Sequence, residues 1–222
     1  MTMPKPIVIF GAGGFAREVL QVALDINEEA ATWQVLGFIV DSGNSTEQVH
    51  DLPVLGGIEW LVQHPETSIV IAVGSSAARH RISMAIGATA PNPFAKLIHP
   101  RAWVGRHVAV GAGTVICAGA LITTDISIGK HVHVNIGATV GHDAVLSDFV
   151  TLNPGVSVSG NVTLAEGVEV GTGSVLIPHA HVGSWSVLGA GAVVTKPLDA
   201  NVTAVGSPAR VLKVRASGWH LG

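Results

Sequence analysis

The sequence predicts a small α/β unit with a parallel sheet, followed by a parallel β-helix built on a six-residue repeat. Three observations predict this fold class. An aliphatic residue recurs at every sixth place from Ile98 to Val194, and an apolar run at residues 7–10 leads into a glycine-rich turn. The composition is also unusual, because 27 of the 222 residues are glycine and only 12% are charged. A stack of short strands and tight corners accounts for both properties.

The repeat occupies the second half of the chain. Stepping by six from Ile98, all 17 positions are Ile, Val or Leu, without an insertion. The next residue is Gly, Ala, Ser, Thr or Cys in 13 of the 17 hexads. The fourth residue after the aliphatic is Ala, Val, Ile, Ser or Thr in every hexad but the last, where it is Leu198. A period of six fits neither an α-helix nor a single amphipathic strand. It predicts short strands joined by close corners, with the aliphatic inside, three walls per coil and coils stacked about 4.8 Å apart.

The first half alternates between apolar strands and helices. Strands are predicted at residues 7–10, 35–40 and 69–73, and helices at 17–26, 56–63 and 75–86. This order is typical of a parallel sheet covered by helices. We expect the division between the two parts near residue 97, so that residues 1–97 form the first domain and residues 98–214 the β-helix, with a closing segment to residue 222.

A glycine motif joins the first strand to the first helix. Gly11-x-Gly13-x-x-Ala16 matches the dinucleotide fingerprint, with Ala in its last place. Gly11, Gly13 and Gly14 would let a diphosphate approach the backbone N–H groups at the start of the helix. Asp41, after the next strand, would accept hydrogen bonds from a ribose or a base. About 95 residues supply only one half of a dinucleotide fold, which favours a nucleotide-sugar over NAD. A tight turn without a ligand is the alternative.

Composition and charge exclude several classes of function. The net charge of −3 gives no support for nucleic-acid binding. Cys117 is the single cysteine, which excludes an intrachain disulfide framework and a cysteine-rich zinc site. No run reaches about 18 apolar residues, so no membrane insertion is expected. The first residues lack the features of a signal peptide, and we expect a cytoplasmic protein.

The aliphatic-and-small hexads resemble those of the hexapeptide-repeat acyltransferases. The segment that begins at Val205 (Val-Gly-Ser-Pro-Ala-Arg) is similar to the loop that closes the helix of this family and contacts coenzyme A. The run Gly-Ala-Gly-Gly-Phe-Ala-Arg-Glu-Val from Gly11 narrows the resemblance to the branch that acetylates bacterial amino sugars and sialic acids. The resemblance implies a left-handed helix and a homotrimer with active sites between neighbouring prisms. Phe15 stands where this branch commonly has a histidine that meets the nucleotide phosphates.

The same resemblance implies the reaction. The chain would be an enzyme that transfers acetyl from acetyl-CoA to a nucleotide-linked 4-amino-4,6-dideoxyhexose used for surface polysaccharide. Pantetheine would lie in the groove between prisms. The residues at matching places in that groove are Gly160, Thr172, Ala190 and Gly206.

Register and resemblance together select one histidine. His142 is in the third place of the hexad that begins at Val140, which puts it beside a corner and facing outward. Gly160, 18 residues further on, would leave open space beside the imidazole. The segment from Asn135 to Asp143 resembles the catalytic segment of the branch. By that resemblance His142 is the general base, Asp143 orients its ring and Asn135 places the substrate.

Three alternatives stay open at this stage. An O-acetyltransferase could act on a sialic acid or another sugar hydroxyl. A metalloenzyme related to the gamma-class carbonic anhydrases would need a His-x4-His pair, which this sequence lacks, so no metal site is predicted. The histidines would then be solvated: His107, His131 and His179 fall in the fourth hexad place, near corners, and His133 and His181 in the sixth. A third possibility is a binding scaffold with an empty groove.

Overall fold

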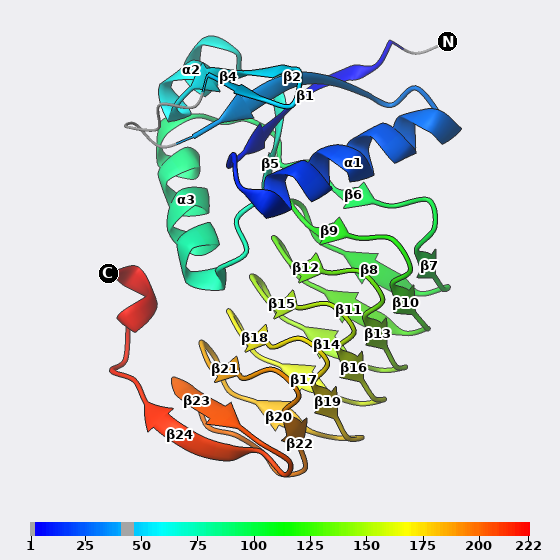
Figure 1. The fold of residues 1–222 in the computed structure, drawn as a ribbon, viewed down its shortest axis with the longest axis vertical. Coiled ribbons are helices and arrows are strands. Elements are labelled where there is room, and N and C mark those ends of the chain that lie inside the picture. The colour runs from blue at the N-terminus through cyan, green and yellow to red at the C-terminus, as the bar shows by residue number, and fades with distance from the viewer. Residues whose placement is uncertain (1–2, 41–46) are drawn as a thin grey trace.

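The computed structural model describes residues 3–40 and 47–222, and its N-terminal part is a mainly parallel sheet flanked by helices (Figure 1). The strand order is β3-β4-β2-β1-β5, and only β3 runs antiparallel to its neighbour. The predicted alternation is confirmed, but the sequence analysis missed β3 and β4. β3 has only two residues and β4 contains Pro53, so neither shows the apolar pattern of a central strand. The elements are β1 Lys5–Phe10, α1 Gly14–Glu29, β2 Trp33–Ile39, β3 Gln48–Val49, β4 Leu52–Gly56, α2 Ile58–Gln63, β5 Ser68–Ile71 and α3 Ser76–Thr89.

The second part is the predicted left-handed parallel β-helix, with three walls that the chain visits in turn (Figure 1). The first wall contains β6 Leu97–Ile98, β9 Val115–Ile116, β12 His133–Val134, β15 Thr151–Leu152, β18 Glu169–Val170, β21 Val187–Leu188, β23 Val202–Val205 and β24 Arg210–Val214. The second contains β7 Trp103–Val104, β10 Leu121–Ile122, β13 Thr139–Val140, β16 Ser157–Val158, β19 Val175–Leu176 and β22 Val193–Val194. The third contains β8 Val108–Val110, β11 Ile126–Ile128, β14 Val145–Leu146, β17 Thr163–Leu164 and β20 His181–Val182.

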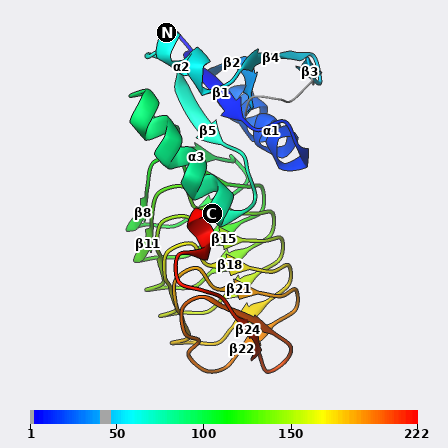
Figure 2. The ribbon, with the colours of Figure 1, turned by 90° about the vertical axis from the view of Figure 1, so that its left-hand side faces the viewer.

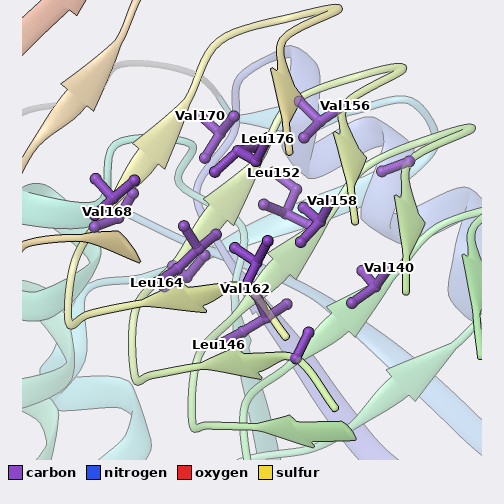
Figure 3. Packing of buried hydrophobic residues seen from close by; sticks show 14 of the residues in the cluster. Val140, Leu146, Leu152, Val156, Val158, Val162, Leu164, Val168, Val170 and Leu176 are labelled. Atoms are coloured by element: carbon purple, nitrogen blue, oxygen red, sulfur yellow. The ribbon is translucent and has the colours of Figure 1, made fainter. Parts of the chain in front are cut away.

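The core of the β-helix is a ladder of aliphatic side chains (Figure 3). From Ile116 to Val194, every sixth residue is buried, as the repeat predicts. The fourth residue after each one, such as Ala144 after Val140, also points inward and is buried. Each coil therefore contributes its apolar side chains to one continuous interior, which stabilises a fold that has few charged groups.

The small residue after the inward aliphatic lies where two coils come closest. A Cβ atom added to Gly141 would lie 2.6 Å from the backbone nitrogen of Gly160 on the next coil. The same addition at Gly171 would lie 2.6 Å from the nitrogen of Ala190. These positions need glycine because a methyl group would enter the neighbouring backbone.

The N-terminal part packs on the first wall through α1 and α3 (Figures 1 and 2). Apolar residues of α1 share a core with Leu97 and Val115 of the first coils. Arg79 of α3 is fully buried at this junction. Its guanidinium donates hydrogen bonds to the carbonyl oxygens of His131 at 2.8 Å and Phe149 at 2.9 Å, and to Thr151 Oγ1 at 2.8 Å. Burial lowers the pKa of Arg79 to about 9, although Glu169 opposes this shift.

Two histidines lie under this junction, His131 at a corner and His133 in β12, and the expectation that they are solvated is wrong for both. His131 is 4% exposed and His133 is 1% exposed. The His131 ring stacks on Phe149 at a centroid distance of 5.1 Å. Burial and the nearby Arg79 lower the pKa of His131 to about 4 and that of His133 well below its usual value. Both imidazoles are therefore neutral at physiological pH.

The C-terminal segment returns along the first wall to α3 (Figure 2). β24 pairs antiparallel with β23, and a short 3-10 helix, η1 Trp219–Leu221, follows. The His220 ring stacks on Trp185 at 3.8 Å, and its carbonyl oxygen accepts a hydrogen bond from Arg81. These contacts hold the end of the chain against the helix that carries Arg79. No helix in the described ranges is both long and apolar enough to cross a membrane.

Candidate active site

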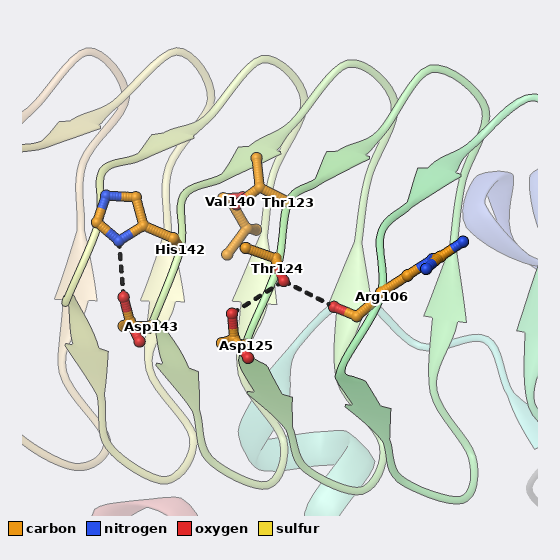
Figure 4. Close-up of polar contacts among 7 residues, drawn as sticks. All are labelled: Arg106, Thr123, Thr124, Asp125, Val140, His142 and Asp143. Carbon is orange, nitrogen blue, oxygen red and sulfur yellow. Dashed lines mark hydrogen bonds and ion pairs between the residues drawn. The ribbon is translucent and has the colours of Figure 1, made fainter.

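His142 lies at the corner between the second and third walls, directly after β13 (Figure 4). Its side chain is 61% exposed, as the register predicts. Its Nδ1 lies 2.8 Å from Asp143 Oδ2. A carboxylate only accepts hydrogen bonds, so Nδ1 carries the proton of this contact. The neutral ring then has its lone pair on Nε2, which is the state that a general base requires.

The conformation of Asp143 explains how two adjacent residues face the same side. Side chains of neighbouring strand residues point to opposite faces. Asp143 has a φ of 58°, in the left-handed region, and this ends the alternation at the corner. The corner therefore turns the carboxylate back toward the imidazole of His142.

The neighbouring coils support this corner on both sides. The Asp143 N–H donates to the carbonyl oxygen of Thr124 at 3.3 Å, and the Asn161 N–H donates to that of His142 at 2.8 Å. Thr124 Oγ1 lies 2.9 Å from the Arg106 carbonyl oxygen and 2.9 Å from Asp125 Oδ2 (Figure 4). The backbone that carries His142 is thus fixed by the ladder, while the imidazole projects from it.

Gly160 stacks on His142, one coil further along the helix. A Cβ atom at this position would lie 2.6 Å from both Cε1 and Nε2 of the imidazole. The sequence analysis expected open space here. Instead, the face of the His142 ring covers this position. Gly160 therefore belongs to the corner of His142 and Asp143.

The other predicted site residues of the β-helix lie at a different corner, between the first and second walls. Asn135 follows β12 and is buried, and its Nδ2 donates to the Leu152 carbonyl oxygen at 2.8 Å. Thr172, Ala190 and Gly206 follow β18, β21 and β23 at the same corner. Within one chain, the second wall separates this group from His142.

The glycine motif lies above the first wall, on the side of Asn135. Gly11 has a φ of 114°, and a Cβ there would lie 3.0 Å from the Ala72 carbonyl oxygen, so both its conformation and its surroundings require glycine. Gly13 precedes α1, and no side chain caps the helix. Gly14 begins the helix and is exposed. The predicted ribose or base contact, Asp41, lies outside the described residues.

Phe15 connects this motif to the β-helix. Its ring lies 4.8 Å from that of His133, centroid to centroid. His133 precedes Asn135 by two residues on the first wall. Phe15, next to the glycine motif, therefore contacts the strand that leads into the Asn135 corner.

Two hollows follow the exposed side of α1. One of about 670 Å³ begins at Gly14 and Arg17 and extends to the turn between β3 and β4. The second, of about 310 Å³, lies between α1 and the first coils and reaches Ile136, next to Asn135. Both are lined by Glu18 and Gln21.

The second hollow contains a polar pair that the sequence analysis missed. His99 Nδ1 accepts a hydrogen bond from the Arg101 N–H, so the Nε2–H of His99 donates to Asp25 Oδ2, 2.6 Å away. Hydrogen bonds from Gln21 and His99 lower the pKa of Asp25. No sequence pattern links these two residues, which are 74 positions apart. Cys117 lines the same hollow, and burial raises the pKa of its thiol to about 12, which makes it a packing residue and not a nucleophile.

Metal-ligating side chains are dispersed over the described ranges. In residues 3–40 and 47–222, no group of three or more His, Cys, Asp or Glu side chains is arranged to hold a metal ion.

Comparisons with known proteins match both parts of the chain. Residues 6–86 match the model of the PglD N-terminal domain. The chain is 31% identical over 216 residues to the GDP-perosamine N-acetyltransferase of Escherichia coli O157:H7. The aligned region covers 92% of this chain and 95% of that protein.

Solved structures with the same architecture cover nearly the whole chain. PerB from Caulobacter crescentus, solved in complex with CoA and GDP-perosamine, has a TM-score of 0.85 and 27% identity, over 94% of this chain and 97% of that one. The acetyltransferase domain of PglB from Neisseria gonorrhoeae FA1090, in complex with acetyl coenzyme A, has a TM-score of 0.85 and 30% identity. This match covers 94% of this chain and 100% of that one.

Proposed function

This chain belongs to the hexapeptide-repeat sugar acetyltransferases that carry a PglD N-terminal domain, and we propose that it N-acetylates a nucleotide-linked 4-amino-4,6-dideoxyhexose. The chain is an acyltransferase, and acetyl-CoA is its co-substrate. The GDP-perosamine named for two of its relatives is a nucleotide-linked sugar of this kind. The product is an acetamido sugar suited to assembly into a surface polysaccharide.

The pair of His142 and Asp143 is the observation that carries this proposal. As the sugar amine attacks the thioester carbon of acetyl-CoA, a C–N bond forms and Nε2 of His142 takes the amine proton. The C–S bond then breaks, and the departing CoA sulfur receives that proton from the imidazolium. Asp143, 2.8 Å from Nδ1, holds the ring and stabilises the positive charge that it carries between these steps. The acetyl group passes directly to the amine, without a covalent enzyme intermediate.

The location of the two corners supports a site shared between copies. The corner of His142 and Gly160 would face the corner of Asn135, Thr172, Ala190 and Gly206 of a neighbouring chain, as in a homotrimer. Backbone groups at Thr172, Ala190 and Gly206 would line the groove for pantetheine. Asn135 would meet the acceptor sugar.

The N-terminal part would hold the nucleotide. Residues 1–97 would bind the nucleotide-sugar, and residues 98–214, closed by the segment to 222, would form the acyltransferase part. The exposed amides at Gly13 and Gly14 suit a diphosphate, because the start of α1 has no side-chain cap. The contact of Phe15 with His133, two residues before Asn135, supports a nucleotide held beside the Asn135 corner.

An acceptor screen tests the proposal. Purified protein is incubated with acetyl-CoA and either an amino-sugar nucleotide or its hydroxyl analogue, and released CoA thiol is measured. We expect turnover with the amine. His142→Ala should lower turnover by at least ~10²-fold, the low end for loss of a general base. His181→Ala is the matched control, because this exposed histidine lies on the third wall, away from the corner. Turnover with the hydroxyl analogue alone would show an O-acetyltransferase, and an unchanged rate in His142→Ala would reject His142 as the base.

A further inference from the structure

We propose that the absence of a side chain at position 160 sets the orientation of the His142 imidazole, so that Gly160 is a positioning residue for the transfer. This inference rests on the proposed function, in which His142 is the general base. It assigns Gly160 a role toward the enzyme's own imidazole, in addition to any contact with acetyl-CoA.

A hydrogen bond at one edge of the imidazole and a close approach over one of its faces restrict the ring. Nδ1 is bound to Asp143 at 2.8 Å. The face of the ring at Cε1, Nε2 and Cδ2 lies over Gly160, where an added Cβ would be 2.6, 2.6 and 3.1 Å away from these atoms. Carbon atoms do not approach this closely, so any side chain at position 160 displaces the ring.

The ring would move, and the backbone would not. The imidazole is the mobile end of a side chain that is 61% exposed. The Gly160 backbone is fixed between coils, and its carbonyl oxygen accepts a hydrogen bond from the His179 N–H at 3.1 Å. Gly160 does not have a positive φ, so alanine adopts its conformation without strain. A substitution here therefore has a small effect on folding and a large one on the ring.

The displaced ring would lose its hydrogen bond to the Asp143 carboxylate. Rotation that lifts Cε1 and Nε2 off position 160 also moves Nδ1 away from Asp143, because all five ring atoms move together as one rigid plane. The base is then no longer held in a single orientation toward the acceptor. A displacement of about 1 Å at a catalytic group can cost up to about 10²-fold in rate.

The stack of residues at this corner contains one glycine. Positions one coil apart here are Arg106, Thr124, His142, Gly160, Pro178 and Lys196. Gly160 is the member without a Cβ atom, and it directly follows the imidazole. The five others carry side chains.

Kinetics of Gly160→Ala in two backgrounds test the inference. In the wild-type background we expect kcat to fall at least ~10-fold, with KM for acetyl-CoA unchanged within about twofold. In the His142→Ala background the same substitution should change the residual rate less than about twofold, because its effect passes through the imidazole. Gly87→Ala on α3, where an added Cβ meets no atom within 4 Å, is the matched control and should leave turnover unchanged.

The outcomes separate this inference from its alternatives. A wild-type kcat in Gly160→Ala would overturn it. An equal fold-loss in both backgrounds would also overturn it, because Gly160 would then act on acetyl-CoA directly. A large fall in the unfolding temperature of Gly160→Ala would assign the residue a structural role instead.

A spectroscopic measurement keeps the inference testable without turnover. Long-range ¹H–¹⁵N correlation of the His142 ring at alkaline pH reports which nitrogen carries the proton. We expect the proton on Nδ1 in the wild type and a mixture of tautomers in Gly160→Ala. If the wild type acetylates no amino-sugar nucleotide, the proposed function fails, and the tautomer comparison still decides the positioning. Identical spectra would contradict it.

Discussion

The environment of each histidine decides what its imidazole can do. His142 projects from a corner into solvent, with one nitrogen tied to Asp143 and the other free. His131 lies at another corner of the same helix, but α3 covers it. The same residue type therefore packs in the interior at one corner, and at the other it has the exposure that the proposed proton transfer requires.

The buried state of His131 predicts acid sensitivity of the fold. Its pKa is about 4 in the folded protein against a usual 6.5. Below pH 6.5 the unfolded chain binds a proton that the folded protein excludes, so stability falls as the pH drops toward 4. The loss from this residue reaches about 3 kcal/mol, and His133 acts in the same direction. Equilibrium urea unfolding at neutral and acid pH measures this loss.

The variant His131→Phe isolates this contribution. Phenylalanine keeps an aromatic ring against Phe149 but carries no titratable group. We expect the variant to lose about 2–3 kcal/mol less than the wild type between pH 7 and pH 4.5. Equal acid losses in the two proteins would show that other groups cause the effect.

Register made some residues predictable and left others hidden. His142 and its exposure followed from counting hexads, because a strict repeat fixes the direction of each side chain. The burial of His131 and His133 did not, because it depends on α3, which comes from another part of the chain. The pair of Asp25 and His99 has the same origin, since it joins α1 to the first coil. Residue spacing carries no information on such packing between parts.

At the scale of elements, glycines of the β-helix meet different neighbours. An added Cβ at Gly141 would meet the backbone nitrogen of Gly160, whereas one at Gly160 would meet the imidazole of His142. A backbone that is bonded on both sides cannot move aside, but a surface side chain can. Two glycines on adjacent coils are therefore expected to have separate consequences, one for folding and, under the proposed function, one for the reaction.

Gly141→Ala should accordingly destabilise the protein. We expect a loss of about 1–3 kcal/mol, the usual effect of overpacking, seen as a lower unfolding temperature in calorimetry. Gly87→Ala, in the interior of α3, should be neutral or stabilising by up to about 1 kcal/mol. An unfolding temperature of Gly141→Ala equal to that of the wild type would show that neighbouring coils can separate without cost.

Elements with a strong period were predicted well, and short ones were not. The inward aliphatic ladder and the turn after each strand follow from a pattern repeated 17 times. The strand of residues 48–49 and the hairpin that it forms with Leu52–Gly56 have no such repetition. Their pairing depends on the exposed edge of β2, which exists only once the sheet has formed.

At the scale of the whole molecule, polar bonds hold the two parts together. Arg79 links α3 to the coils of His131 and Phe149, and Glu169 accepts a hydrogen bond from the Ser76 N–H at the start of the same helix. The glycine motif is thereby held in a fixed relation to the Asn135 corner. His142, beyond the second wall, lies apart from both.

Mixed oligomers test whether the site is shared between copies. His142→Ala and Asn135→Ala would each be inactive alone, because every site would lack one of its residues. Unfolding and reassembling the two together should restore measurable turnover, since some interfaces then combine an intact corner from each variant. Each variant taken separately through the same procedure is the control. Absence of any recovery, with mixed oligomers demonstrated by differently tagged chains, would place the whole site within one copy.

In an uninterrupted repeat, the residue number gives the position of a residue along the axis of the β-helix. Eighteen residues return the chain to the same corner one coil further on, so the position of each functional group along the axis follows from counting residues. Inserting or deleting one full rung would shift everything beyond it by about 4.8 Å while leaving every side chain facing its original direction. Insertion or deletion of whole coils would therefore change the distance along the axis between two functional groups. It would leave the direction of each side chain unchanged.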